Sequence, residues 1–353
     1  MDILSWQGLL GGLSPWTYVG IGLVSVQLTI MAVTLYLHRS QAHGGVVFHP
    51  AVNHVFRFWL WFTTGMVTRE WVAIHRKHHA FSDRPGDPHS PVTKGIWRIF
   101  PFGVIEYVRE AHNRETIERY GRGTPDDWLE RRVYSAHPVL GVASGFLAAI
   151  LLFGPAVGVM IALAHVLWIP FWAAGVINGL GHSLGYRNYA TTDNSRNTVP
   201  FFAFAVWIGG EELHNNHHAY ATSAKFSHRW FEFDIGWGVI VLLSWCGLAT
   251  VKHRAPRAVY DEAKSVPDAE TLAAVRALRF DVLSRFDRLV QHSRADVDWQ
   301  GIRARLIALW EERRSEHELL ANLRLWHAEA MRSGSEALQA FAKHLARLRT
   351  AKA

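Results

Sequence analysis

Residues 75–79 read His-Arg-Lys-His-His, and residues 214–218 read His-Asn-Asn-His-His. A third pair, His38 and His43, precedes them with four residues between its members. In a chain of 353 residues with 21 histidines, roughly 0.07 copies of H-x-x-H-H are expected by chance, so two copies indicate a purpose-built site. Because positions i, i+3 and i+4 share one face of a helix, each five-residue pattern is predicted to turn three imidazoles toward a common point.

These three segments predict a site for two metal ions, because one ion does not accept eight histidines. Imidazole binds iron, copper, zinc and nickel, so the spacing alone leaves the metal open. A cysteine-based cluster within one chain is excluded, since Cys246 is the single cysteine. The ligands predicted from the segments are His38, His43, His75, His78, His79, His214, His217 and His218.

Long apolar runs are concentrated in residues 1–250, whereas residues 252–353 are charged and polar at helical spacing. A helix needs about 20 apolar residues to cross a bilayer. Three stretches are predicted to cross: Pro15–Leu37, Val139–Phe153 and Ala156–Gly181. A net charge of +7 and 16 tryptophans fit a membrane surface, and without a nucleic-acid motif we expect no nucleic-acid partner.

A shared metal site restricts how the other apolar stretches run. If His38–His43 and His75–His79 bind the same metals, they lie on one side of the membrane, and a single crossing between them is forbidden. Residues 51–67 are too short for two crossings and contain Arg57, so they are predicted to lie along the interface. We expect the same of residues 235–251, because 17 residues are few for a crossing and a basic segment follows them.

Basic residues give the predicted orientation. Residues 69–135 hold many lysines and arginines and residues 1–14 hold none, which predicts that the histidines face the cytoplasm, at a bacterial inner membrane. The predicted fold is all-α: an integral membrane helical bundle of about three crossings plus interfacial helices, with a cytosolic histidine-rich cap. This domain is predicted to span residues 1–255, and residues 256–353 to form a cytosolic helical extension. The extension is expected to pack on the cap or on a second copy, or else to dock a redox partner.

The histidine segments resemble the three histidine boxes of membrane fatty acyl desaturases, in particular the bacterial type of the delta-9, stearoyl-CoA desaturase-like branch. Asn178-x3-His182, at the end of the last predicted crossing, matches an asparagine and a ninth histidine of that branch. The stretch from Asp83 to His89 also resembles it, and His89 is interpreted as a residue that orients a ligand. The likeness covers residues 15–250 and leaves out the last hundred residues or so.

The resemblance implies a non-haem di-iron centre that uses O2 to insert a cis double bond, here expected at delta-9, into a saturated acyl chain. Its ligands would be the eight histidines above and His182, with Asn178 reaching one iron through a water. No catalytic residue beyond these ligands is predicted. A narrow acyl tunnel is also implied, and its candidate lining residues are Trp59, Trp61, Phe62, Trp168, Phe171 and Trp172.

The acyl carrier and the electron donor stay open. Animal acyl-CoA desaturases have an Arg-Asp pair directly before the second box, where this chain has Ala73-Ile74. CoA, a membrane lipid and a carrier protein are therefore all retained. The candidate residues for binding a phosphate-bearing head group are Arg69, Lys94, Arg98 and Arg109. A fused cytochrome b5 domain would carry a His-Pro-Gly-Gly motif that this chain lacks, which predicts a separate ferredoxin-type or cytochrome-type donor with its reductase.

Two other functions fit part of the pattern. A related di-iron hydroxylase of fatty acids or alkanes uses similar boxes, although the spacing of the first box and Asn178-x3-His182 favour desaturation. A membrane metal transporter or sensor would carry its ligands within the membrane spans, whereas the boxes here lie at or beyond the predicted ends of the spans.

Overall fold

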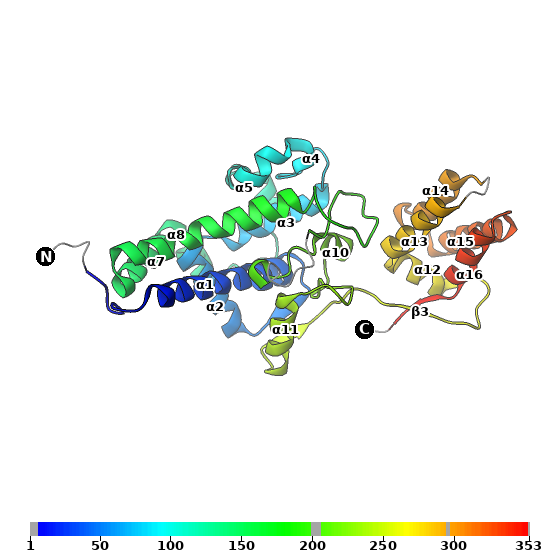
Figure 1. Ribbon diagram of the computed structural model, residues 1–353. Coiled ribbons are helices and arrows are strands. Elements are labelled where there is room, and N and C mark those ends of the chain that lie inside the picture. Colours follow the sequence, from blue (N-terminus) through cyan, green and yellow to red (C-terminus); the bar gives the residue numbers. More distant parts are fainter. Residues whose placement is uncertain (1–5, 199–205, 294–296, 352–353) are drawn as a thin grey trace. The chain divides into compact units, whose positions relative to one another are not determined.

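The computed structural model describes residues 6–198, 206–293 and 297–351, and it is mainly helical, as predicted (Figure 1). Contacts divide the chain into two units. The first comprises Met1–Arg187 and Thr192–Arg254, and the second comprises Asn188–Thr191 and Ala255–Ala353.

Two long apolar helices form the stem of the first unit (Figure 1). Helix α1 (Pro15–Met31) continues into the π-helix η2 (Ala32–Ala42), and α8 (Pro155–Ile169) continues into the π-helix η4 (Pro170–Leu180). With 28 and 26 residues, they are the two helices of the described chain that are long and apolar enough to cross a membrane. They start at the same end of the unit, because backbone N–H groups just before α1 donate to carbonyls at the end of α7 (Pro138–Phe153), directly before α8.

The remaining predicted crossing, Val139–Phe153, corresponds to α7, which is apolar but has only 16 residues. A tight turn at Gly154, whose φ of 81° suits glycine, reverses the chain between α7 and α8. The two helices pack closely: a side chain at Gly158 would lie 2.4 Å from the carbonyl oxygen of Ala149. The number of crossings therefore stays a prediction.

Helix α2 (Pro50–Thr64) corresponds to the stretch predicted to lie along the interface. It packs against α7, where the carbonyl of Trp61 approaches Gly141 so closely that no side chain would fit. Arg57 is buried and pairs with Asp127 and, at 2.9 Å, with Glu130. The charge predicted to keep this segment out of the bilayer thus has carboxylate partners within the protein.

The remaining elements of the first unit are α3 (Thr68–Phe81), α4 (Pro91–Lys94), α5 (Ile96–Ala111), α6 (Arg114–Tyr120), η3 (Glu130–Tyr134), α10 (His214–Ala219) and α11 (Ile235–Trp245). Strand β1 (Val46–Phe48) pairs antiparallel with β2 (Ala249–Val251). This pairing joins the segment after the first histidine pair to the end of the unit, so the cap closes on itself beside the metal ligands.

The second unit has its own core, as an amphipathic sequence predicts. Its helices are α12 (Ala269–Ala277), α13 (Arg279–His292), α14 (Trp299–Glu311), α15 (Glu316–Arg332) and α16 (Glu336–Ala346). Phe286, Leu323 and Trp326 are among its buried residues. Strand β3 (Ala258–Tyr260) pairs antiparallel with β4 (Leu348–Thr350), which ties the two ends of the unit together.

Candidate metal centre

The first histidine pair lies at the end of the π-helix η2, with His38 inside the helix and His43 directly after its last residue. The backbone N–H of His43 donates to the carbonyl of His38 at 3.2 Å, the i to i+5 pairing that defines this winding. The two imidazoles therefore point to one side, with ring centres 5.1 Å apart. An α-helix, with 3.6 residues per turn, would have turned them apart. The four-residue gap of the first box is thus matched to a π-helix.

All nine predicted histidines come together, but in two groups rather than box by box. Ring nitrogens within each group lie within 4.8 Å of one another. The five-histidine group contains His38, His43, His75, His79 and His217, and the four-histidine group contains His78, His182, His214 and His218.

This division corrects the prediction that each H-x-x-H-H box points three imidazoles at one place. In α3, His75 and His79 join the five-histidine group, whereas His78 turns to the four-histidine group. In α10 the first and last histidines likewise stay together and His217 turns away. Four residues slightly exceed one helical turn and three fall short of it, so the middle histidine faces the other side of the shared face. Each of the two H-x-x-H-H boxes therefore contributes to both groups, whereas His38 and His43 both belong to the five-histidine group.

The ring nitrogens of the five-histidine group converge. The Nε2 atom of His75 lies 2.8 Å from that of His43 and 3.1 Å from that of His79. The Nε2 atom of His217 lies 2.9 Å from those of both His38 and His79.

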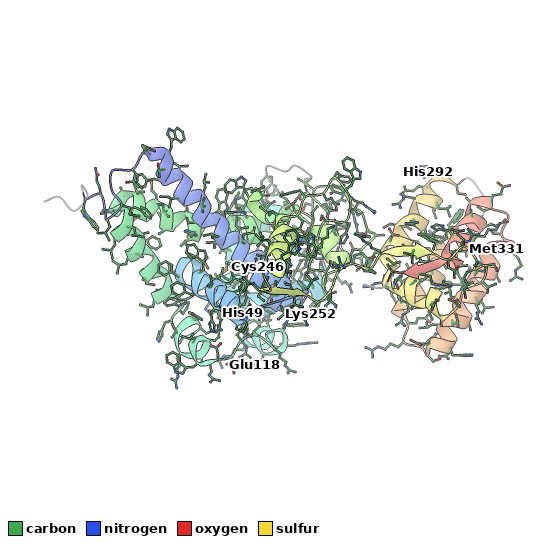
Figure 2. All side chains as sticks on the ribbon, turned by 90° about the horizontal axis from the view of Figure 1, so that it is seen from below. His49, Glu118, Cys246, Lys252, His292 and Met331 are labelled. Atoms are coloured by element: carbon green, nitrogen blue, oxygen red, sulfur yellow. The ribbon has the colours of Figure 1, made fainter. Side chains whose placement is uncertain are left out.

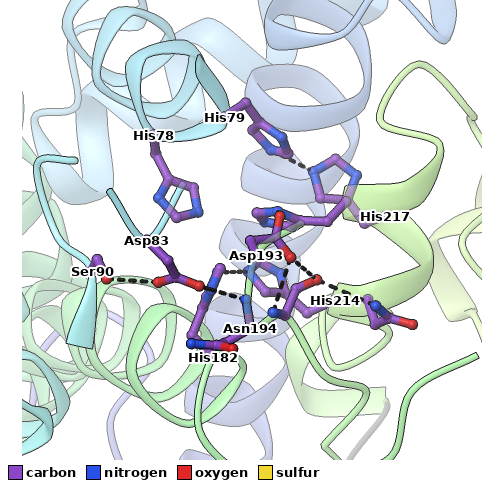
Figure 3. A network of polar contacts seen from close by, with 12 residues as sticks. His78, His79, Asp83, Ser90, His182, Asp193, Asn194, His214 and His217 are labelled. Carbon is purple, nitrogen blue, oxygen red and sulfur yellow. Dashed lines mark hydrogen bonds and ion pairs between the residues drawn. The ribbon is translucent and has the colours of Figure 1, made fainter. Parts of the chain in front are cut away.

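The four-histidine group is completed by His182, which follows η4 directly. Its Nε2 atom lies 3.0 Å from that of His214 (Figure 3). The ring centre of His218 is 4.9 Å from that of His182 and 4.4 Å from that of His214.

Carboxylates hold the outer nitrogen of four ligands. The pairs, measured from Nδ1 to a carboxylate oxygen, are His38–Glu211 at 2.7 Å, His78–Asp87 at 3.0 Å, His182–Asp83 at 2.9 Å and His218–Asp193 at 2.8 Å. A carboxylate accepts a hydrogen bond that a ring N–H donates, so these contacts assign the proton to Nδ1 and the lone pair to Nε2. The lone pairs therefore point toward the centre of each group.

Two of these carboxylates, Glu211 and Asp193, are absent from the residues predicted as functional. Glu211 stands beside the third box, but Asp193 is distant in sequence from His218 and no spacing rule connects them. Asp83 has a φ of 61°, rare for a residue other than glycine, and its carboxylate also accepts the backbone N–H of Asn194 at 2.7 Å (Figure 3). This strained turn aims Asp83 at His182.

The donor set fits two metal cations. Pairs of imidazole nitrogens face each other at 2.8–3.1 Å. In the pairs His38–His217 and His182–His214, a carboxylate fixes one of the two nitrogens as a lone pair, and a cation between the rings would accept it. Among the described residues, the buried Nε2 atoms of His78 and His218 have no hydrogen-bond partner, as expected of atoms that bind metal. Cys246 is exposed in the first unit and belongs to neither group (Figure 2).

Burial keeps most of these imidazoles neutral, the state that binds metal. It lowers the pKa of His43, His75, His79, His214 and His217 well below the ordinary value, with further lowering from neighbouring histidines. It lowers the pKa of His218 to about 4 against the pull of Asp193. For His78 the opposing charge of Asp87 outweighs burial, and the pKa is raised.

A largely apolar cavity of about 350 Å³ reaches both groups, since His38, His75 and His214 line it. Asn178 lines the same cavity, as does Glu211. Ile30, Val33, Val166 and Ile169 line it within the stem, and Val104, Tyr107 and Val108 line it from α5. Of the six aromatic residues suggested for the tunnel, Trp172 lines the cavity described here and the other five do not.

Two further polar residues, His89 and Glu70, line the cavity. His89 lies beside His78, with ring centres 4.4 Å apart, and its backbone N–H donates at 3.0 Å to Asp87, the carboxylate that contacts His78. Glu70 was not predicted, and burial raises the pKa of its carboxyl.

Three of the basic residues suggested for a head group surround one carboxylate. Lys94, Arg98 and Arg109 contact Glu106 at 2.9, 2.8 and 2.7 Å. Burial acts to raise the pKa of Glu106, but these cations outweigh it and lower that pKa to about 2. Three positive charges around one negative charge leave the cluster cationic.

A buried ion pair fixes the frame behind the histidines. The Arg39 guanidinium donates to both oxygens of Asp234, at 2.8 and 3.0 Å, and to the carbonyls of Gly209 and Ala224 at 2.9 Å. Arg39 is 1% exposed, and its neighbour His38 is a candidate ligand. The charge network therefore ties η2 to the segment around the third box.

Comparison with known proteins places this arrangement in a family. Residues 14–235 match the model of the fatty acid desaturase family. The chain belongs to the fatty acid desaturase family. It is therefore an oxidoreductase that acts on fatty acyl chains, and the resemblance drawn from the boxes is confirmed.

Individual relatives agree with this assignment. The chain is 28% identical over 238 residues to the delta-9 acyl-lipid desaturase 1 of Arabidopsis thaliana, an alignment that covers 67% of this chain and 75% of that protein. It is 31% identical over 238 residues to the sn-1 stearoyl-lipid 9-desaturase of Synechocystis sp., covering 66% and 71%. The family match ends at residue 235, before the Ala255–Ala353 part of the second unit.

Proposed function

We propose that this desaturase inserts a cis double bond at the delta-9 position of an acyl chain carried by a membrane lipid. The observation that carries this proposal is the apolar cavity that passes both histidine groups. A chain lying in it would present one carbon–carbon bond to the metals while the walls exclude water.

We propose that the two groups hold two non-haem iron ions, with the nine histidines as direct ligands and Asn178 acting through a water. Bound iron would supply the oxidising power, in reaction with O2, that no side chain offers for an unactivated methylene. The protein's own part is to keep the imidazoles neutral by burial and oriented by carboxylates.

The opening of the cavity favours a lipid as the acyl carrier. Val104 and Val108 line the cavity and are also 38% and 48% exposed, so the cavity reaches the surface at α5. The same helix exposes Trp97, Phe102 and Ile105, and the Lys94–Arg98–Arg109 cluster lies on it or just before it. An apolar face with a cationic cluster suits the edge of a bilayer with phosphate head groups. The names of the relatives, acyl-lipid and stearoyl-lipid desaturases, support the same carrier.

Expression in a host that makes no unsaturated fatty acids tests the reaction. Gas chromatography of its lipids should reveal a cis double bond between C9 and C10, and the bond should form on acyl groups already esterified in lipid. In vitro, labelled phospholipid should be desaturated and labelled acyl-CoA should not. A hydroxylated chain without a double bond would instead identify the hydroxylase alternative, and exclusive use of acyl-CoA would overturn the lipid assignment.

We also propose three crossings, α1–η2, α7 and α8–η4, in a bacterial inner membrane with the metals on the cytoplasmic side. The single cysteine makes a direct test possible, because Cys246 is exposed. In intact spheroplasts a membrane-impermeant maleimide should leave Cys246 unlabelled and should label a Gln7→Cys variant that also carries Cys246→Ser. The reverse pattern would invert the proposed orientation.

A further inference from the structure

An exposed aromatic pair lies on the loop between α10 and α11. Trp230 is 95% exposed, more than any other large apolar side chain of the described residues, and Phe231 beside it is 43% exposed. Their ring centres are 5.8 Å apart. Leu184, 61% exposed, lies two residues from Tyr186, whose ring centre is 5.9 Å from that of Phe231. These side chains form an exposed apolar surface on the first unit.

Basic residues flank this aromatic surface. Arg229 precedes Trp230 in the sequence, and Arg187 follows Tyr186 and is exposed. Arg196 donates to the carbonyl of Gly185 at 3.1 Å, next to Tyr186. The nearby carboxylates are engaged in the interior, with Glu232 bound to Tyr186 at 2.9 Å and Asp193 bound to His218. The rim of the aromatic surface is therefore positive.

A short chain of contacts connects this surface with the metal ligands. From Trp230 and Phe231 it reaches Tyr186, whose hydroxyl donates to one oxygen of Glu232 at 2.9 Å. The other oxygen of Glu232 accepts from the amide of Asn216 at 2.8 Å. Asn216 lies in α10, directly before the candidate ligand His217. The network therefore connects the aromatic surface to the helix that carries the third box.

The proposed reaction requires electrons from outside the chain. Forming one double bond from CH2–CH2 consumes O2, two electrons and two protons and yields CH=CH and two water molecules. A carrier that delivers one electron at a time must bind and leave twice in each turnover, which suits a small interface. Tryptophan and arginine are the residues that contribute most at such contacts, and a positive rim speeds the approach of an acidic partner.

We propose that Trp230 and Phe231, with the flanking Arg187, Arg196 and Arg229, form the docking surface for an acidic one-electron carrier protein that reduces the metal centre. This proposal rests on the proposed desaturase function and names the partner of that site. The electrons enter beside α10, at the end of the contact chain through Tyr186, Glu232 and Asn216.

Kinetics with two reductants tests the surface. The full-length enzyme in lipid vesicles is assayed with a plant-type [2Fe–2S] ferredoxin and with a soluble cytochrome b5 domain, each with its reductase, and the faster donor is retained. Trp230→Ala should lower kcat/KM for that donor about tenfold or more. At low salt, Arg187→Glu should lower kcat/KM for the donor further than Trp230→Ala does. It should also make kcat/KM depend less on ionic strength. The matched controls, Trp128→Ala and Arg132→Glu, alter exposed residues away from the surface and should behave as the parent enzyme.

The same variants are then reduced with dithionite and methyl viologen and mixed with O2 for a single turnover. Trp230→Ala should give the product yield of the parent enzyme, because the metal centre is intact. An equal loss with the chemical reductant would overturn the docking role and would indicate a lipid or structural contact. Unchanged kinetics with the protein donor would also overturn it, as would a parent enzyme that works with dithionite but with neither acidic donor. A parent enzyme that forms no product even with dithionite would instead count against the proposed function.

Discussion

The two histidine groups share the two H-x-x-H-H boxes but are held in different ways. In the four-histidine group, three of the four ligands have a carboxylate at 2.8–3.0 Å from Nδ1. In the five-histidine group, His38 alone has such a partner, Glu211 at 2.7 Å, within the described residues. The four-histidine group would thus hold its metal through nearby negative charge and oriented rings. The five-histidine group would hold its metal through burial and a larger number of ligands.

This difference suggests that the two groups bind their metals with different affinity. A carboxylate behind an imidazole fixes the ring and raises its basicity, which strengthens the bond to a cation. Three such carboxylates also place more negative charge near the four-histidine group, which stabilises the more oxidised state of a metal there. We therefore expect the five-histidine group to lose its metal first.

The largest effect is expected from removing one ligand of each group. His217→Ala and His218→Ala should both abolish desaturation, because each opens a different metal site, while the stem helices stay folded without the metal. Metal analysis of the purified variants should fall from about two irons per chain to about one. With His217→Ala the remaining iron should resist a chelator better than the iron left by His218→Ala.

Helical content measured by circular dichroism serves as the control for folding. Full activity of His217→Ala would contradict the site assignment. Equal resistance of the two variants to the chelator would contradict the difference between the groups.

The next effect concerns the carboxylates. Asp193→Asn and Glu211→Gln keep size and shape but remove the charge behind His218 and His38. Each should lower metal affinity or activity about 10–100-fold. Asp193→Asn should weaken metal binding by the four-histidine group and so reduce the difference in chelator resistance between the two groups. Glu211→Gln should weaken metal binding by the five-histidine group and so increase that difference. Titration of the metal-depleted protein with Fe²⁺ measures both.

Asp126→Asn provides the matched comparison, since Asp126 is 74% exposed and pairs only with exposed Arg131 among the described residues. It should bind iron like the parent protein. A loss as large as that of Asp193→Asn would show that surface charge, rather than the contact with His218, controls affinity.

The same contrast explains what the sequence could and could not predict. The nine histidines were found from spacing and resemblance because helical geometry fixes neighbours three or four residues apart. Their division into two groups was missed, since it depends on how α3 and α10 face each other across the cap. The π-winding of η2 was also missed, although the gap from His38 to His43 is the one signal in the sequence that fits it.

Contacts between distant segments account for the remaining gaps. Asp193 and His218 are 25 residues apart in the sequence, and no spacing rule connects them. The residues proposed to bind a head group were chosen by their charge alone. Nothing in the sequence near them predicted that Lys94, Arg98 and Arg109 would all contact Glu106. The stem was easier, because apolar length identifies α1–η2 and α8–η4 directly.

The smallest expected effect is a loss of stability that should affect metal binding in the five-histidine group more than in the four-histidine group. Arg39 is buried against Asp234, and Arg39→Met would leave that carboxylate without its cation. Breaking a buried pair from one side costs about 3–5 kcal/mol, whereas Arg131→Met at the exposed pair should cost about 1 kcal/mol or less. Thermal unfolding in detergent measures the difference. Because Arg39 follows His38 and ties η2 to the third box, the metal of the five-histidine group should be lost at a lower temperature than global unfolding. Simultaneous loss of both metals with unfolding would instead mean that Arg39 supports the two groups equally.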